Sequence, residues 1–177
     1  MAISAYLRRL RERIGRELVL MPSVAVMIRD EAGRLLLVRS ADYGLWQTVG
    51  GAIDPGETPA DAAVREAFEE SGLEVQLTGV LGVHGGPLFR LGYPNGDVCE
   101  YTAISFGARP TGGAIRADGD ETTDVRWFTA GQAAALEVAP HTRFLVTRRS
   151  GRTRPRPTTG RSGVPATAWA SANVNNG

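Results

Sequence analysis

Hydrophobic and polar residues alternate with a helical period at the start of this chain, and shorter apolar runs come after this segment. Residues 3–18 place apolar side chains at helical spacing with arginines between them, which predicts an amphipathic helix. Later runs that are continuously apolar or alternate with polar residues predict β-strands. These runs are residues 23–30, 34–40, 73–85, 97–110 and 124–129. Residues 129–138 and 140–150 predict two short helices after the last strand.

Turn signals and one change of composition divide the chain. Residues 30–33, Asp-Glu-Ala-Gly, predict a hairpin between the first two strands, and the Asn-Gly pair at 95–96 predicts another turn. The C-terminal segment is rich in Gly, Pro, Ser, Thr and Arg without periodicity, which predicts a disordered basic tail over residues 150–177. Its arginines either contact a polyanion or belong to a solvated extension, and the second is favoured. The expected organisation is a helix in residues 1–19, a domain in residues 20–149, and this tail.

The composition is typical of a soluble globular protein. With 177 residues, 42% of them hydrophobic and 22% charged, the chain is long enough for one domain with a core. It contains no apolar run of the roughly 18 residues that a membrane span needs, and its N-terminus lacks the apolar region of a secretory signal. The single cysteine, Cys99, excludes an internal disulfide. We therefore expect a cytoplasmic protein with no membrane partner.

The charge is divided unevenly, although the net charge is only +1. All 20 basic residues are arginine; five of them lie in residues 1–19 and six in residues 148–161. Residues 20–147 carry nine arginines and 17 of the 19 acidic residues. A nucleic-acid-binding domain carries its positive charge on the fold itself, so the acidic body argues against a specific nucleic-acid partner. If this acidic part of the chain binds anions, it needs a cation to do so.

The densest acidic segment is GGAIDPGETPADAAVREAFEESGL, residues 50–73. Thr58 is a suitable N-cap residue, and Pro59 suits the first helical position. Gly72 is a natural residue at which to end a helix. The segment therefore predicts a loop followed by a helix over residues 59–71.

Three glutamates of this helix, Glu66, Glu69 and Glu70, fall within one sector of about 100°. Val64 and Phe68 fall on the opposite side with Ala60 and Ala67 beside them, and we expect these four residues to form the buried stripe of the helix. The like charges repel one another and lie near the helix C-terminus, where the helix dipole disfavours anions. A divalent cation relieves both penalties, and oxygen ligands without Cys or His favour Mg²⁺, or Mn²⁺, over Zn²⁺. Taken alone, the three glutamates are better explained by a solvated helix face.

The residues around these glutamates form a longer pattern, which resembles the signature of the Nudix hydrolase family. The pattern consists of Gly51, Glu57, Arg65-Glu66, Glu69-Glu70 and Gly72-Leu73. Ala67 and Val49 depart from the residues that are more usual in the family. The resemblance extends over residues 22–146 and implies an α/β fold, a Nudix-type α/β/α sandwich with a mixed β-sheet. It places the glutamate helix on one face of the sheet and the C-terminal helices on the other.

The resemblance also implies a metal site and a reaction. Family members cleave a diphosphate that joins a nucleoside to another group, by Mg²⁺-assisted attack of water. Mapped by the motif, Glu66, Glu69 and Glu70 are expected as catalytic metal ligands, with the carbonyl of Gly50 as a further ligand. Glu66 is also a candidate general base. Glu121 is expected as a fourth ligand or as that base, with a solvated acidic loop as the equal alternative.

Other positions are expected to support this site. Gly51, with Gly50, lets the backbone approach the metal, which a side chain would obstruct. Glu57 and Arg65 are expected to pair and to hold the loop against the helix, which is a structural role.

Substrate contacts are expected from residues outside the motif. Arg39 is a candidate for pairing with phosphate, although a surface charge is equally open. Tyr43 and Trp46 are candidates for stacking on a base, and core packing is at least as open for Trp46. His84 is better explained as an incidental loop histidine than as a phosphate contact. Pro87 resembles in its approximate placement a proline that marks ADP-ribose hydrolases.

We therefore expect a Mg²⁺-dependent hydrolase that cleaves the pyrophosphate bond of a small-molecule nucleoside diphosphate derivative. An ADP-ribose-like substrate is slightly favoured, and damaged nucleoside triphosphates, dinucleoside polyphosphates and nucleotide sugars stay open. One alternative is a catalytically silent Nudix-fold nucleotide-binding or regulatory domain, which would be expected to lose motif glutamates. Another is an interaction protein whose basic tail binds nucleic acid. The N-terminal amphipathic helix packs on its own domain or on a partner, which leaves a homodimer open.

Overall fold

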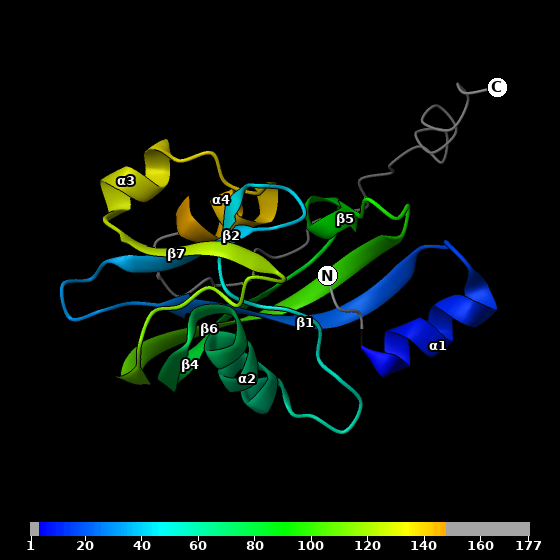
Figure 1. The fold of residues 1–177 in the computed structure, drawn as a ribbon, viewed down its shortest axis with the longest axis horizontal. Helices are drawn as coiled ribbons and strands as arrows, with labels where there is room; N and C mark the ends of the chain where they lie inside the picture. Colours follow the sequence, from blue (N-terminus) through cyan, green and yellow to red (C-terminus); the bar gives the residue numbers. More distant parts are fainter. Residues whose placement is uncertain (1–3, 148–177) are drawn as a thin grey trace, which may run out of the picture.

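The strands of the first sheet run in mixed directions (Figure 1). The computed structural model describes residues 4–147. Strand β1 (Val19–Ile28) lies parallel to β6 (Val98–Gly113). Strand β6 pairs in antiparallel fashion with β4 (Leu73–His84) and with the short β5 (Arg90–Gly92). The sheet is therefore mixed, as the sequence predicts.

A second sheet has β2 (Leu35–Ser40) at its centre, paired in antiparallel fashion with β3 (Trp46–Gln47) and β7 (Thr122–Phe128). The predicted hairpin between the first two strands is wrong as a strand pairing. The turn at residues 30–33 forms, but β1 and β2 share only the bridge between Arg29 and Leu35.

The edge of β1 that a hairpin partner would occupy is taken by the loop before the glutamate helix. The backbone N–H groups of Val24 and Val26 donate to the carbonyls of Gly51 and Val49, at 2.9 and 2.8 Å. This pairing brings the glycine-rich loop against β1.

Helices cover both faces of the strands. Helix α2 (Pro59–Ser71) lies on one face, and α3 (Ala130–Ala135) and α4 (Pro140–Thr147) lie on the other (Figure 1). Neighbouring residues of β1 alternate between the two sides: Val24 packs in the core cluster with α2, and Ala25 packs in the cluster with α3 and α4. This is the α/β sandwich that the sequence predicts. The 3₁₀ helix η1 (Pro87–Phe89) follows β4.

Helix α1 (Ala5–Ile14) packs beside the sheet and is shorter than the predicted segment 3–18. It ends because Gly15 adopts φ +61, a conformation that favours glycine and interrupts the helix. Leu18, expected on the apolar stripe, is 44% exposed because the chain has already turned toward β1.

The bounds of α2 confirm the predicted helix over residues 59–71. Thr58 Oγ1 accepts from the N–H of Asp61 at 3.2 Å, and Gly72 ends the helix with φ 72. These are local capping interactions, and they are therefore readable from the sequence.

The predicted buried stripe of α2 is wrong except at Ala67, which is buried; Ala60 is exposed. Val64 and Phe68 are 41% and 49% exposed. The buried face instead carries alanines and glutamates, namely Ala62, Ala63, Glu66, Ala67 and Glu70, followed by Ser71. Because the alanines are small, the helix lies close to the sheet. Glu66 and Glu70 are buried, whereas Glu69 is exposed at the rim.

The predicted tail over residues 150–177 lies outside the described residues, as do residues 1–3. Within residues 4–147, no helix is both long and apolar enough to cross a membrane.

Candidate active site

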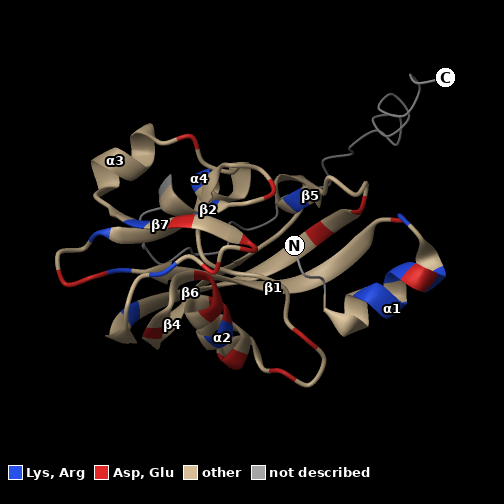
Figure 2. Cartoon of the chain, in the orientation of Figure 1, with Lys and Arg blue, Asp and Glu red and all other residues tan. Residues whose placement is uncertain are grey.

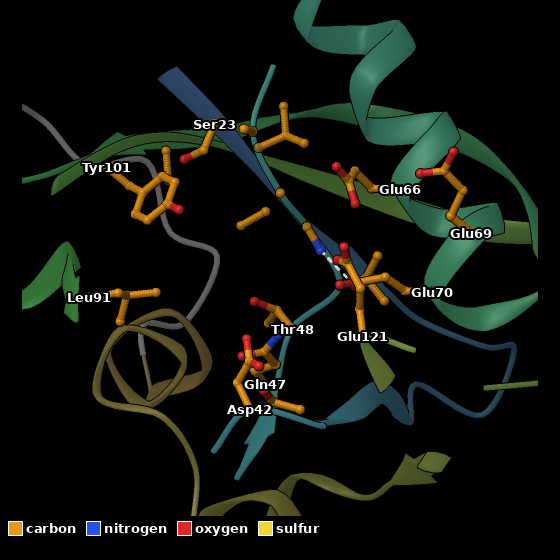
Figure 3. Close-up of a pocket in the computed structure, with 18 of the residues that line it drawn as sticks. Ser23, Asp42, Gln47, Thr48, Glu66, Glu69, Glu70, Leu91, Tyr101 and Glu121 are labelled. Carbon is orange, nitrogen blue, oxygen red and sulfur yellow. Dashed lines mark hydrogen bonds between the residues drawn. The ribbon is translucent and has the colours of Figure 1, made fainter. Parts of the chain in front are cut away.

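A cavity of about 750 Å³ lies between α2, the loop before it and the loop before β7. Its residues come from segments that are far apart in the sequence, including Ser23 of β1, Thr48, Tyr101 of β6 and Glu121 (Figure 3). Acidic residues gather along α2 and the loop that precedes it (Figure 2). We call the part of the cavity lined by Glu66, Glu69, Glu70 and Glu121 the glutamate end.

Glu66 and Glu70 are buried carboxylates. They are only 7% and 3% exposed. Burial raises the pKa of Glu66 to about 7, although the nearby Arg65 opposes this shift. Burial also raises the pKa of Glu70 well above its usual range, and the neighbouring Glu66 and Glu121 add to the effect. Two such groups are stable as anions only beside a cation.

The glycine-rich loop meets these glutamates through its backbone. The N–H of Gly50 donates to Glu70 Oε2 at 3.0 Å. A Cβ on Gly51 would lie 2.7 Å from the carboxyl carbon of Glu66, and a Cβ on Gly50 would overlap with the carbonyl oxygen of Val24. The loop therefore fits against α2 and β1 only without side chains at these two positions.

Arg65 connects the loop to the glutamates. Its Nε and Nη2 donate to the two carboxylate oxygens of Glu57, at 2.8 and 2.9 Å, so the predicted pair forms. Its Nη1 donates to Glu66 Oε1 and to Glu69 Oε2, both at 2.9 Å. Its Nη2 also donates to the carbonyl of Ala52 at 3.2 Å. The hydrogen bonds from Arg65 lower the pKa of Glu57.

Glu121 reaches the glutamate end from a loop with a fixed shape. Asp118 Oδ1 accepts from the N–H groups of Asp120, Glu121 and Thr122, at 2.8, 2.9 and 2.9 Å. Thr122 Oγ1 then donates to the carbonyl of Glu70 at 3.1 Å, which holds the loop against the end of α2. In Figure 3, Glu121 points toward Glu70.

One of the three predicted substrate contacts lies at the cavity, and the other two do not. Tyr43 lines the cavity, but Arg39 and Trp46 do not. Trp46 packs edge to face against Phe128 at 4.9 Å, which is the core-packing alternative. Arg39 is exposed, and its Nε donates to the carbonyl of Gly44 at 2.9 Å. The structure therefore does not bring these two residues to the glutamates.

Several lining residues were missed by the sequence analysis: Leu7, Tyr93, Tyr101, Arg116 and His141. No local motif marks them, because each reaches the cavity through packing between distant segments. The register of β1 and β6, for example, places Tyr101 opposite Met21 and so beside the N-terminal helix. His84 lies outside the cavity and stacks on Phe89 at 6.1 Å.

The donor set fits a hard divalent cation. All donors at the glutamate end are oxygens, which suits Mg²⁺ or Mn²⁺. Two of the four carboxylates are more than nine-tenths buried. Among the described residues, no three carboxylates are arranged as a group that could hold a metal ion. Glu66 and Glu69 instead accept hydrogen bonds from Arg65. Binding a cation therefore competes with Arg65 for these side chains.

We expect Glu70→Gln to stabilise the metal-free protein increasingly as pH rises. The folded-state pKa of Glu70 lies above its unfolded value, so ionisation costs stability as pH rises through and beyond about 4.5. The expected gain is absent near pH 4 and grows toward pH 8, where the variant melts at a higher temperature than the wild type.

Thermal melts in chelator, compared between wild type and variant at matched pH, measure this gain. The comparison cancels groups with the opposite trend, such as His141, whose pKa burial lowers. A difference in melting temperature that stays constant from about pH 4 to about pH 8 would contradict the raised pKa of Glu70.

Comparisons with known proteins agree with this geometry. A family model described as the NUDIX domain matches residues 19–149. A protein named putative 8-oxo-dGTP diphosphatase from Bacillus subtilis (strain 168) is 35% identical over 113 residues, which cover 64% of this chain and 69% of that protein. A MutT-like protein from Streptomyces ambofaciens is 36% identical over 107 residues, which cover 60% of this chain and 62% of that protein.

A solved structure shares the fold. The MutT protein from Methanosarcina mazei Go1 superposes with a TM-score of 0.60 at 22% identity, over 73% of this chain and 92% of that one. At this identity the similarity shows the fold alone.

Proposed function

Because this chain belongs to the Nudix hydrolase family, whose enzymes act on phosphoanhydride bonds, we propose that it is a Mg²⁺-dependent hydrolase of a nucleoside diphosphate linked to another moiety. The observation that carries the proposal is the burial of Glu66 and Glu70 at one end of a cavity large enough for a nucleotide. Arg65 offsets part of this charge at Glu66, whereas Glu70 is held by the uncharged N–H of Gly50. A buried carboxylate without a cation costs stability, and a metal-dependent reaction would explain the burial of Glu70.

The residues that would hold the metal are Glu66, Glu69 and Glu70, with the carbonyl of Gly50 as the further ligand that the family motif implies. Mn²⁺ suits the same oxygen donors. When bound, the cation supplies Lewis acidity to the diphosphate and to the attacking water, and it neutralises charge on the phosphate oxygens. Mg²⁺ dependence is therefore the expected behaviour.

The chain's own residues position the reaction. The hydrogen bond from Gly50 orients the carboxylate of Glu70. Arg65 holds Glu66 and Glu69 until a cation competes for them, and its bonds to Glu57 keep it beside the site. We propose that Glu66 of α2 or Glu121 of the loop before β7 accepts the proton from water, because both carboxylates line the glutamate end.

Two substrate classes have specific support. ADP-ribose-like substrates are the sequence-based expectation. A damaged nucleoside triphosphate is the second candidate, because the name of the Bacillus subtilis relative specifies 8-oxo-dGTP. Both contain a phosphoanhydride next to a nucleoside, and so both use the same glutamate end.

A substrate panel tests the proposal. The full chain is incubated with Mg²⁺ and ADP-ribose, nucleoside triphosphates including 8-oxo-dGTP, dinucleoside polyphosphates or nucleotide sugars, in water enriched in ¹⁸O. We expect a nucleoside monophosphate among the products, ¹⁸O in one phosphate product, and loss of turnover in chelator. Binding without turnover for every compound would instead support the catalytically silent alternative.

Arg116 is expected to bind the phosphates of the substrate. Arg65 and Arg116 are the cations that line the cavity within the described residues, and Arg65 is held by three glutamates. The backbone N–H of Arg116 donates to the carbonyl of Ser71 at 2.8 Å, which places it beside the end of α2. We expect Arg116→Gln to lower kcat/KM by at least about tenfold, since a charge-assisted hydrogen bond contributes about 1.5–3 kcal/mol.

The matched control for this variant is Arg109→Gln. Arg109 is an exposed arginine of β6 outside the cavity, where its Nε donates to Gln76 at 2.9 Å. Steady-state kinetics on the best panel substrate separate the two variants. Equal kcat/KM values for Arg116→Gln and Arg109→Gln would show that Arg116 does not bind the substrate.

A further inference from the structure

The end of the cavity away from the glutamates is lined by three tyrosines and by helix α1. We call Leu7, Tyr43, Tyr93 and Tyr101, which all line the cavity, the tyrosine end. The rings of Tyr43 and Tyr93 lie 6.2 Å apart, and the hydroxyls of Tyr93 and Tyr101 contact each other. In Figure 3, Tyr101 lies across the cavity from Glu66, Glu69 and Glu70.

Helix α1 contributes to this end although it lies outside residues 19–149, which match the family model. Leu7 is 8% exposed and packs in one apolar cluster with Tyr93 and Tyr101. Ser4, which caps the helix by accepting from the N–H of Leu7 at 3.3 Å, also lines the cavity. The wall of the cavity therefore includes Ser4 and Leu7, which lie outside the part of the chain that the family model matches.

Arg11 fastens α1 in this position. Its Nη2 donates to the carbonyl of Val98 at 2.9 Å and to Cys99 Sγ at 3.3 Å, both at the start of β6. It also forms an ion pair with Asp97 at 3.4 Å, and its side chain is largely buried. The helix is thus held to the strand that carries Tyr101, rather than lying loosely on the surface.

The tyrosine end is chemically unlike the glutamate end. Tyr43 donates its hydroxyl proton to the carbonyl of Gly92 at 3.0 Å, and the other two hydroxyls pair with each other. Burial raises the pKa of Tyr43 to about 12, with Asp42 adding to the shift, so its ring stays neutral. Neutral rings with bonded hydroxyls offer flat apolar surface, which suits an aromatic base and not a phosphate.

Resting on the proposed function, we infer that the tyrosine end, with Leu7 of α1 as part of its wall, binds the base of the nucleotide substrate. The phosphates then extend toward the glutamate end. A second cavity of about 180 Å³ is also lined by Leu7, Tyr93 and Tyr101, so these side chains form a shared wall between the two spaces. Leu7 therefore limits the size of the base that the larger cavity accepts.

Two truncations in the same helix test this inference. Leu7 and Leu10 both pack in the α1 cluster, but Leu10 lines neither cavity. On the panel substrate that the wild type hydrolyses best, we expect Leu7→Ala to raise KM at least fivefold with kcat within twofold. Leu10→Ala is expected to leave KM within twofold while lowering the melting temperature comparably. Equal KM values for the two variants would overturn the inference.

A second measurement needs no variant and uses the full chain. NMR spectra of the backbone amides are recorded with Mg²⁺ and one of three compounds: AMP, GMP or ribose 5-phosphate, which lacks a base. We expect AMP or GMP to shift the signals of Leu7, Tyr93 and Tyr101, and ribose 5-phosphate to leave them in place. Shifts confined to the glutamate end in an active enzyme would overturn the base assignment and leave the proposed function standing. Absence of hydrolysis across the panel would overturn the proposed function itself.

Discussion

Replacing Glu70 by glutamine is expected to lower the rate of phosphoanhydride hydrolysis by at least about two orders of magnitude while the protein stays folded. Glu70 is 3% exposed and accepts a hydrogen bond from the N–H of Gly50. Glutamine keeps the shape and an oxygen that accepts this bond, but it removes the negative charge. The variant therefore separates the loss of a charged metal ligand from the loss of packing.

The rate is measured with saturating Mg²⁺ on the best panel substrate, and folding is checked by thermal melting. Glu74→Gln is the matched control, since Glu74 is an exposed glutamate of β4 away from the cavity. It is expected to keep its full rate. An active Glu70→Gln enzyme would show that Glu70 does not hold the metal.

Replacing Gly50 by alanine is expected to cost about 3 kcal/mol of unfolding free energy and to lower the melting temperature by about 10 °C. Gly50 adopts φ +152, and an added Cβ would overlap with the backbone oxygen of Val24. Because that oxygen belongs to the backbone of β1, it cannot move aside as a flexible side chain would. The loop must shift instead, and its hydrogen bond to Glu70 is lost with it.

Gly131→Ala is the control for this variant. Gly131 lies in α3, its φ is not positive, and no atom lies within 4 Å of the position of an added Cβ. Thermal melts are expected to leave its stability unchanged or slightly raised. If Gly50→Ala melted at the same temperature as the wild type, the close approach of the loop to β1 would be refuted.

The elements of the fold that local rules control were predictable from the sequence. The bounds of α2 followed from Thr58, Pro59 and Gly72, because capping interactions join residues close together in the chain. The mixed sheet and the helices on both faces followed from the resemblance to a known family. Strand pairing was less accessible: no local signal shows that residues 49–51 take the edge of β1 that a hairpin would use.

The orientation of α2 shows why sequence patterns mislead at a functional site. An apolar stripe normally marks the buried face, yet Val64 and Phe68 are exposed and Glu66 and Glu70 are buried. The inversion places charge where folding alone disfavours it, which is expected at a site that binds a ligand. The position of Tyr101 was equally hard to predict from the sequence, because only the pairing of β6 with β1 brings this residue to α1.

The central claim is that Glu66, Glu69 and Glu70 hold a divalent cation next to the substrate phosphates. Crystals of the full chain grown with Mn²⁺ and a non-hydrolysable nucleoside diphosphate analogue test it most directly, through anomalous scattering from manganese. We predict an anomalous peak within ligand distance of these carboxylates, with Arg65 displaced from Glu66 or Glu69. A bound analogue with no manganese at the three glutamates would contradict the account.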